Sequence, residues 1–183
     1  VSVDGGTIKL DGNYPVGTNN VALGNAAGDA MASGGNNVSV GSSALTTNTS
    51  GGDNVAVGSA SMANNQSGSY NTSLGRQALA ANTTASNNTA VGYQSGYSNT
   101  TGTITAFGTS AGYSATTATN NSIFGVEANY YTTTGSENAS FGYNAGAFTT
   151  TGSNNTALGS KALRSNTTGN YNLASGYASL RLN

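Results

Sequence analysis

Glycine recurs along this chain with a nearly constant 17-residue period, and this period constrains the fold more than any other feature. Successive glycines of the series are separated by the same interval throughout, apart from one interval that is shorter by a single position. The glycines are Gly24, Gly41, Gly58, Gly75, Gly92, Gly108, Gly125, Gly142, Gly159 and Gly176. A fixed period of this kind indicates a tandem repeat, in which each unit packs against its sequence neighbours.

Two further columns accompany the glycine. Val, Leu or Phe stands directly before it, except in the last unit, where Ser175 takes that place. Asn stands four positions before it, except in the shortened unit, where Ile104 occurs. The Asn residues are Asn20, Asn37, Asn54, Asn71, Asn88, Asn121, Asn138, Asn155 and Asn172. We expect the deleted residue of the shortened unit to belong to the adjoining turn.

Small and polar residues fill the rest of the unit. Ala or Ser stands three positions after each glycine, and a Thr pair such as Thr83-Thr84 comes later in several units. The density of Gly, Asn, Thr and Ser disfavours helix. The sequence therefore predicts an all-β fold, a parallel β-solenoid (β-roll) of about ten 17-residue coils with two short strands and two turns per coil. At about 4.8 Å per coil, the rod would be roughly 48 Å long.

The residue order within the unit suggests what each column does. In the segment from Asn88 to Gly92 the residues alternate as in a strand, and we expect the apolar pair, Thr89 and Val91 in this unit, to face inward. Asn side chains one coil apart can form a hydrogen-bonded ladder with each other and with the turn backbone, and ligand binding by Asn is the less favoured alternative. The signature glycine indicates a positive φ or a close backbone approach.

The central units differ from the outer ones. Four positions after the glycine, outer units place Leu45, Met62, Leu79, Leu163 and Leu180, whereas central units carry Gly96, Gly112 and Gly146. An aromatic residue follows one or two places later at Tyr97, Tyr113 and Phe148, and the same units contain Phe107, Phe124 and Phe141. We therefore predict a thicker, aromatic-filled cross-section in the middle of the rod, with sugar stacking as the alternative role of these rings.

Composition argues against several partners. Charged residues make up 6% of the chain, the net charge is −1, and there are only five Lys and Arg residues. Such a chain has little to neutralise a phosphate backbone or an anionic lipid surface, so we expect no nucleic acid partner. No run approaches the roughly 20 apolar residues of a membrane helix, so we expect no membrane insertion. The absence of Cys favours an extracellular location.

The residue inventory also limits catalysis. Without His or Cys, the chain has no Ser-His triad, no Cys-His pair and no ordinary zinc site. A glycan hydrolase needs two carboxylates roughly 5 to 10 Å apart, and Glu127 and Glu137 are the pair whose proximity stays open. The full acidic set is Asp4, Asp11, Asp29, Asp53, Glu127 and Glu137. We predict that the chain is not an enzyme and has no catalytic, cofactor-binding or metal-binding residues and no cofactor.

Two other patterns have alternative explanations. Rows of Thr suggest ice binding, but adjacent Thr residues cannot both face one side of a strand, so they are better explained as turn residues. Asn48, Asn82 and Asn166 begin Asn-x-Ser/Thr sequons, which occur by chance in a repeat rich in Asn and Thr.

The units from Asn154 to Gly169 and from Asn87 to Gly96 resemble the repeats of bacteriophage tail-fibre proteins. They are also similar in pattern to the head repeats of trimeric autotransporter adhesins, which have an apolar-Gly signature on a shorter period. The resemblance covers roughly residues 19–180. It implies a homotrimer of parallel solenoids, a virion or cell-surface location, and attachment to a host. The 17-residue unit and the lack of a coiled-coil stalk or membrane anchor within this chain favour the phage fibre over the adhesin.

These observations predict a non-enzymatic fibre segment that acts as a rigid spacer in host attachment. The chain would divide into an N-terminal cap or junction at residues 1–18 and the repeat solenoid at residues 19–183. Self-association through an apolar face would supply the core that a thin solenoid lacks. A glycan-binding surface adhesin is the main alternative, and exposed rings at Tyr93, Tyr143 and Tyr177, each directly after a signature glycine, would favour it.

Overall fold

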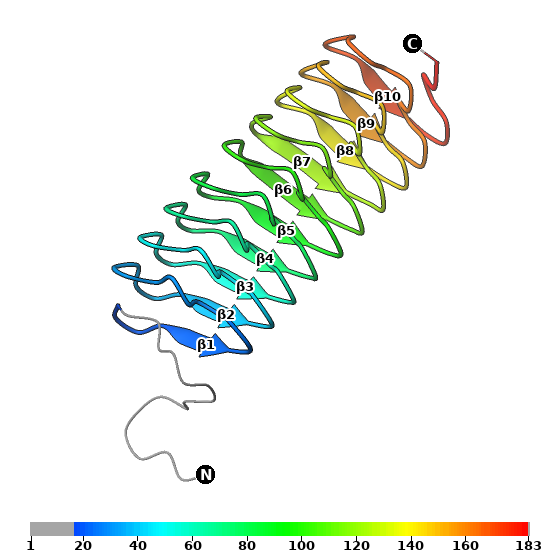
Figure 1. Cartoon of the computed structure of the whole chain (residues 1–183). Coiled ribbons are helices and arrows are strands. Elements are labelled where there is room, and N and C mark those ends of the chain that lie inside the picture. Colours follow the sequence, from blue (N-terminus) through cyan, green and yellow to red (C-terminus); the bar gives the residue numbers. More distant parts are fainter. Residues whose placement is uncertain (1–16, 183) are drawn as a thin grey trace.

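The computed structural model describes residues 17–182, which form one sheet of ten short parallel strands (Figure 1). The strands follow one another across the sheet in sequence order. They are β1 (Val21–Leu23), β2 (Val38–Val40), β3 (Val55–Val57), β4 (Thr72–Leu74), β5 (Thr89–Val91), β6 (Ile104–Phe107), β7 (Asn121–Phe124), β8 (Ala139–Phe141), β9 (Thr156–Leu158) and β10 (Leu173–Ser175). The predicted all-β parallel β-solenoid with a 17-residue period is confirmed.

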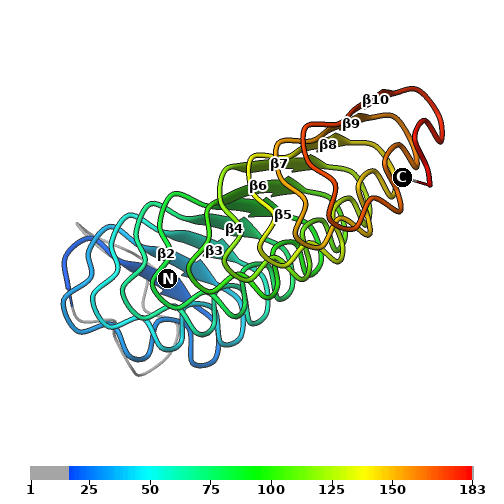
Figure 2. The same cartoon turned by 90° about the horizontal axis from the view of Figure 1, so that it is seen from above.

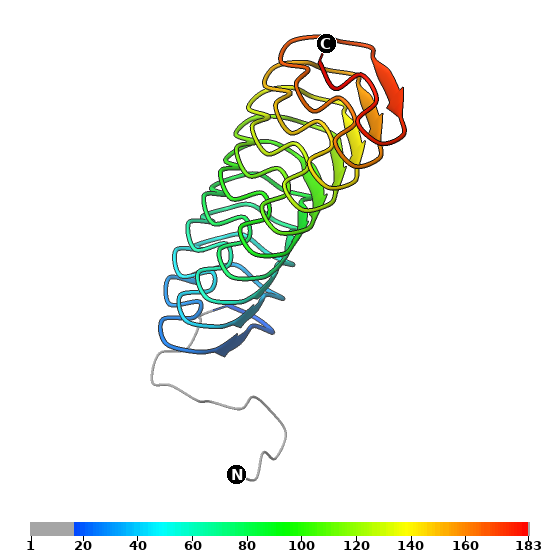
Figure 3. The same ribbon diagram turned by 90° about the vertical axis from the view of Figure 1, so that its right-hand side faces the viewer.

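Each strand pairs with the equivalent residues of the next coil. Ser39 of β2 lies between Ala22 of β1 and Ala56 of β3, one period away on each side. Across the short unit Ala90 pairs with Ala106, so the register of the sheet survives the deletion. The coils therefore stack into an elongated rod with the sheet along one side (Figures 2 and 3).

The missing residue of the short unit falls in the bend before β6, as expected. In a full coil Asn54 comes three positions after Gly51, whereas Ile104 comes only two positions after Gly102. Ile104 pairs with Asn121, so it occupies the Asn column of the sheet.

Each described coil contains one strand, so the prediction of two strands per coil is wrong. Beyond the strand the backbone alternates between ordinary and left-handed residues, with positive φ at Gly41, Ser43 and Leu45 in one coil. Such alternation is incompatible with extended β-structure. The segment nevertheless bonds to the adjacent coil, since the Leu45 amide donates to the Ser61 carbonyl at 3.1 Å.

The signature glycine satisfies both of its predicted requirements. Gly92 has a φ of +132°, and a Cβ at this position would lie 2.5 Å from the carbonyl oxygen of Gly108 in the next coil. A side chain would therefore be strained by the backbone angle and would also collide with the neighbouring coil.

The side of each strand that lines the interior of the coil is opposite to the predicted side. Asn88 and Ala90 are buried, whereas Thr89 and Val91 lie on the partly exposed outer face. The prediction that the apolar pair faces inward is therefore wrong. A 17-residue coil closes so tightly that its interior accepts Ala, Ser and Asn in these columns, and stacked Val, Leu and Phe would overfill it.

The predicted Asn ladder is present and buried. The Asn54 side-chain amide donates to the Asn37 side-chain carbonyl at 3.1 Å and to the Gly68 backbone carbonyl at 2.9 Å. The Asn54 backbone amide donates to the same Asn37 oxygen at 3.0 Å. Each such Asn thus satisfies the hydrogen-bonding groups of side chains and backbone that would be costly to bury unpaired.

A second buried Asn column was not recognised from the sequence. It contains Asn48, Asn65, Asn82, Asn99 and Asn166, each fully or almost fully buried. The Asn65 amide donates to the Asn48 side-chain carbonyl at 2.9 Å and to the Gly68 carbonyl at 2.9 Å. Asn48, Asn82 and Asn166 of this column are the first residues of the sequons noted above. These Asn residues therefore have a structural role inside the rod.

Most of the large apolar side chains of the core come from a left-handed position four places after the signature glycine. Leu45, Met62 and Leu79 are fully buried there, with φ values of 50°, 49° and 49°. Gly96 replaces them in the fifth coil, and Ile104 fills the space from the Asn column. A Cβ on Gly96 would lie only 2.6 Å from the Ile104 Cδ1 atom.

The same exchange occurs one coil later, where a Cβ on Gly112 would lie 2.9 Å from the Cδ1 atom of Ile123. Aliphatic side chains therefore fill the centre of the rod. The prediction of an aromatic-filled cross-section is wrong, because the rings of Tyr97, Tyr113 and Phe148 are partly exposed at the surface.

The predicted cap at residues 1–18 lies almost wholly outside the described residues. The first described residues already follow the repeat, since the Thr18 carbonyl accepts the Asn36 amide at 2.9 Å. Among residues 17–182, no helix is long and apolar enough to cross a membrane.

Candidate functional site

The outer side of the sheet is a continuous uncharged surface, which we call the sheet face. Its side chains are the first and third positions of the repeated strand, and none of them is buried. They are Val21, Leu23, Val38, Val40, Val55, Val57, Thr72, Leu74, Thr89, Val91, Thr105, Phe107, Ser122, Phe124, Ala139, Phe141, Thr156, Leu158, Leu173 and Ser175. Contiguous apolar surfaces of this kind usually mark contact sites.

Three stacked rings stand in the middle of the sheet face. Phe107 and Phe124 lie 5.0 Å apart between ring centroids, and Phe124 and Phe141 lie 4.9 Å apart. Phe107 and Phe141 are 36% and 38% exposed. The sequence analysis predicted that these Phe residues fill the core, whereas they lie on the surface.

The exposed tyrosines named from the sequence border the sheet face. Tyr93, Tyr143 and Tyr177 are 42%, 51% and 74% exposed. Each directly follows the signature glycine that ends a strand, and they stand three or two coils apart, so they do not form a continuous row. Arg76 lies over the Tyr93 ring at 5.8 Å, and Lys161 lies over the Tyr177 ring at the same distance.

A second row of rings runs along the rod away from the sheet face, at the position five places after the glycine. Tyr97 stacks on Tyr113 at 5.1 Å, and Tyr113 stacks on Tyr130 at 4.9 Å. The row then shifts by one position, where Tyr131 stacks on Phe148 at 4.8 Å and meets Tyr130 edge-on at 4.6 Å. Sequence reasoning singled out Tyr97, Tyr113 and Phe148 but did not recognise Tyr130 and Tyr131.

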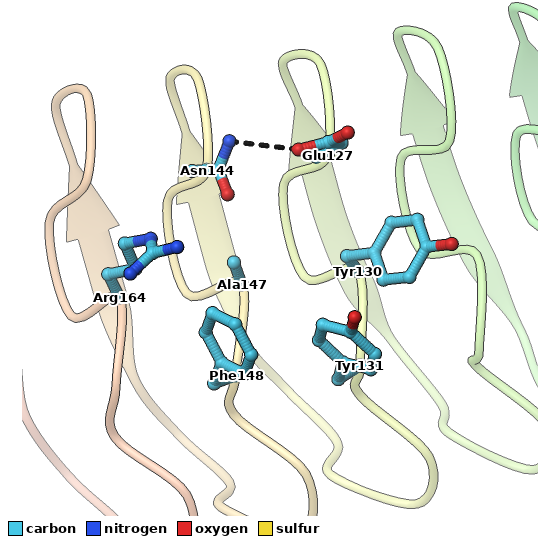
Figure 4. A pocket seen from close by; sticks show the side chains of 7 residues that line it. All are labelled: Glu127, Tyr130, Tyr131, Asn144, Ala147, Phe148 and Arg164. Atoms are coloured by element: carbon cyan, nitrogen blue, oxygen red, sulfur yellow. Dashed lines mark hydrogen bonds between the residues drawn. The ribbon is translucent and has the colours of Figure 1, made fainter.

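A surface hollow of about 260 Å³ lies where this row shifts (Figure 4). The side chains drawn there surround Ala147, the residue that follows Tyr130 in the row. The hollow is lined by Glu127, Tyr130, Tyr131, Asn144, Ala147, Phe148 and Arg164. The hollow therefore combines aromatic rings with one carboxylate, one amide and one guanidinium.

The polar groups of the hollow are held in place by the rod. The Asn144 side-chain amide donates to the Glu127 Oε2 atom at 3.1 Å. The Arg164 guanidinium lies over the Phe148 ring at 4.9 Å, a cation–π arrangement. Burial raises the pKa of the Tyr130 hydroxyl, and the nearby Tyr113, Tyr131 and Glu127 groups raise this pKa further.

The acidic residues do not assemble into a catalytic pair within the described chain. Glu127 lies beyond the end of β7 and lines the hollow, whereas Glu137 precedes the start of β8 and does not line it. The two residues thus stand at opposite ends of strands that are about 10 Å long. Asp53 bonds to Asn36 at 3.1 Å at the same end as Glu137. Asp4 and Asp11 lie outside the described residues.

No group of three His, Cys, Asp or Glu side chains that could hold a metal ion occurs within residues 17–182. A second shallow hollow, of about 290 Å³, lies beside the short coil and is lined by residues that include Asn87, Thr103 and Asn120. Its lining contains neither a carboxylate nor a cation. The hollow around Ala147 therefore has the more varied chemistry.

The Thr pairs lie in the bends between strands. The hydroxyl of the first Thr donates to a carbonyl of the next coil, as from Thr100 to Thr116 at 3.1 Å and from Thr116 to Thr133 at 3.1 Å. The second Thr of each pair, such as Thr117, is exposed. Their assignment to turns agrees with the structure, and in most pairs the first hydroxyl is already bonded to the next coil.

No family model, curated protein or solved structure matches this chain. The sheet face and the hollow around Ala147 are the two surfaces of the described residues that could contact a partner or ligand.

Proposed function

We propose that the chain is a structural segment of a fibre, a rigid spacer that associates as a homotrimer through the sheet face. The observation that carries this proposal is the apolar, uncharged sheet face on a rod whose interior is already filled. The resemblance to phage tail-fibre repeats supports a place in a virion tail fibre or a similar extracellular appendage that attaches to a host. In this role the chain needs no catalytic site.

The rigidity of a spacer has a physical basis in this rod. Backbone hydrogen bonds join successive coils both in the sheet and around the rest of the turn, and two buried Asn columns cross-link the interior. Bending the rod would require several of these parallel rows to stretch together. Repeats of this type therefore transmit force along their axis with little flexibility.

The sheet face has the size of the functional patches found on protein surfaces. The face extends across all ten strands of the sheet. Strands this short are about 10 Å long and lie about 4.8 Å apart, so together they cover roughly 430 Å² of flat area. The largest apolar patches on monomers have similar areas and are often functional. The exposed fractions of Leu74 and Leu158 are 48% and 50%, so the face has apolar area left to bury.

The occupant that best fits this face is a second copy of the chain. An identical copy presents the same columns at the same repeat, so parallel rods can pack Val and Leu rows and the Phe107–Phe124–Phe141 rings over their whole length. No charged residue interrupts the face, so packing buries no unpaired charge. The resemblance to trimeric fibres favours threefold symmetry about an axis parallel to the rods.

The test is the solution mass of the purified chain by light scattering. We expect three times the 18.0 kDa mass of one chain. The variant Phe124→Asp places a charge in the middle of the sheet face and should yield monomers that keep the β-type circular dichroism spectrum. Thr84→Asp, in an exposed bend, is the matched control and should remain trimeric. A monomeric wild-type chain would contradict the proposal.

The positions of the Thr pairs in the structure do not favour ice binding. An ice-binding surface requires rows of Thr side chains on a flat face, whereas the Thr pairs lie in bends and the first hydroxyl of the pair bonds to the neighbouring coil. The flat face of this rod carries Val, Leu and Phe alongside Thr.

A further inference from the structure

The hollow around Ala147 lies where the row of rings is interrupted. The residues five places after the glycine in five successive coils are Tyr97, Tyr113, Tyr130, Ala147 and Arg164. The first three stack at 5.1 and 4.9 Å, close to the coil spacing. In the next coil a methyl group takes the place of the ring, and this methyl group is covered by its neighbours, since Ala147 is only 1% exposed. The open space of the hollow therefore lies outside Ala147, between side chains that include Tyr130, Phe148 and Arg164.

The hollow, at about 260 Å³, is smaller than most pockets that enclose drug-sized ligands, which measure roughly 300 to 1,000 Å³, so it suits a small ligand. Tyr131 and Phe148 form one wall of the hollow, in a column displaced by one position from that of Tyr130. A ligand there would be a single ring, free or as one unit of a longer chain that continues along the rod.

The polar groups restrict which ring fits. The Glu127 Oε2 atom accepts the Asn144 amide at 3.1 Å, which leaves the second carboxylate oxygen, Oε1, able to accept a hydroxyl. Arg164 stacks on Phe148 and makes no ion pair with a described carboxylate, so its N–H groups can donate to a ligand. The ligand therefore needs donors and acceptors on its edge and an apolar face for the tyrosine ring.

Charge excludes simpler ligands. A cation in the hollow would be attracted by Glu127 and the rings but repelled by Arg164, and an anion would meet the opposite conflict. A purely apolar ring would cover Glu127 and Arg164 without replacing their water. A neutral ring with hydroxyls satisfies both groups, and its C–H face suits the negative face of an aromatic ring.

We propose that the hollow formed by Glu127, Tyr130, Tyr131, Asn144, Phe148 and Arg164 is a carbohydrate-binding site that takes one neutral pyranose unit of a surface glycan against its tyrosine rings. The site lies outside the strands and does not use Tyr93, Tyr143 or Tyr177. It goes beyond the spacer role and does not depend on it, because every residue of the site comes from one chain.

The experiment is saturation-transfer NMR on the full chain with the methyl glycosides of glucose, galactose, mannose and N-acetylglucosamine at millimolar concentration. We expect at least one glycoside to receive saturation, with a dissociation constant in the millimolar range. Ala147→Tyr adds a ring that must project into the hollow and should abolish the signal. Ala63→Tyr, at the same repeat position but distant from the hollow, is the matched control and should bind as the wild type does.

A second variant keeps the test decisive if Ala147→Tyr does not fold. Glu127→Gln retains the size of the side chain and should weaken binding by about tenfold, while its melting temperature stays close to that of the wild type. The proposal is overturned if no glycoside receives saturation, if Ala147→Tyr folds and binds unchanged, or if tetramethylammonium or adenosine binds and the glycosides do not. The oligomeric state is measured separately by light scattering, and a failure of the trimer prediction would not affect this result.

Discussion

The side chain of Asn99 donates a hydrogen bond of 3.0 Å to the side-chain carbonyl of Asn88, and in doing so joins the two Asn columns at the short coil. Ile104 occupies the next place in the Asn88 column and can offer only its backbone amide, at 2.7 Å. Asn99 therefore provides the side-chain donor that the column lacks. As a consequence, the Asn82 side-chain oxygen, one coil below Asn99, is buried without a partner.

We expect Asn88→Ala and Asn99→Ala to be energetically coupled. Both residues are buried, so removing either leaves the other short of one hydrogen bond. Such a bond contributes about 0.5–1.5 kcal/mol. A double-mutant cycle measured by urea unfolding should therefore give a coupling energy of at least about 0.5 kcal/mol. Asn166→Ala, in the same column as Asn99 but remote from Asn88, is the control and should be additive with Asn88→Ala. Additivity of the first pair would disprove the cross-link.

The signature glycine offers a comparison between two ends of one column. Gly92 and Gly176 both have positive φ, of 132° and 111°, but a Cβ on Gly92 would lie 2.5 Å from Gly108, whereas one on Gly176 would have no neighbour within 4 Å. We expect Gly92→Ala to lower the free energy of unfolding by about 1–3 kcal/mol more than Gly176→Ala, because the second variant has backbone strain alone. Equal losses would show that coil spacing does not constrain this position.

Gly96 and Ile104 should behave as alternative ways to fill the same space. Gly96→Leu alone would collide with Ile104. Ile104→Ala alone would leave a cavity costing about 2–5 kcal/mol. Together they place a Leu at the position that Leu79 occupies in the preceding coil and remove the side chain that it would meet. We expect the double variant to be more stable than the sum of the two single changes predicts, as measured by urea unfolding. A double variant as unstable as that sum would refute the exchange.

The titration of Tyr130 provides a test of the ring row. Burial raises its pKa above the ordinary value of 10.0, so the folded chain holds this proton more tightly than the unfolded chain. The contribution of Tyr130 to stability is therefore complete below about pH 10 and declines as the pH rises from there towards the folded pKa. Carbon-13 NMR of the tyrosine Cζ atoms should show this raised pKa, and Glu127→Gln should lower it in part. A Tyr130 pKa at or below the ordinary value would contradict the packing described here.

Several features follow from the sequence because they depend on the period alone. A 17-residue interval places equivalent residues next to each other in successive coils, which is why the parallel in-register sheet, the Asn column at Asn54 and its neighbours, and the glycine at Gly92 could all be predicted. The physical requirement at each position is local: a strand pair, a hydrogen-bonded side chain, and a backbone angle with no room for Cβ.

The residues of the hollow could be predicted only in part. Glu127 stood out because acidic residues are rare here, and Phe148 because it is the aromatic residue that follows Gly146, which replaces the Leu of the outer units. Tyr130, Tyr131 and Arg164 did not, because the interruption of the ring row at Ala147 becomes visible only when the coils are stacked and the row is followed along the rod. A repeat alignment that compared each column for its exceptions would have found this position.

The sequence by itself determined that this chain stacks 17-residue coils with identical columns in contact. The tertiary structure decided which columns lie inside. Alternation along Asn88, Thr89, Ala90 and Val91 defines two faces of a strand but does not say which one the coil encloses. That choice depends on the width left after the backbone closes through its left-handed residues. In most coils this width admits Asn and Ala from the strand together with one Leu or Met from the left-handed segment, and it leaves the Val, Leu and Phe side chains of the strand on the surface.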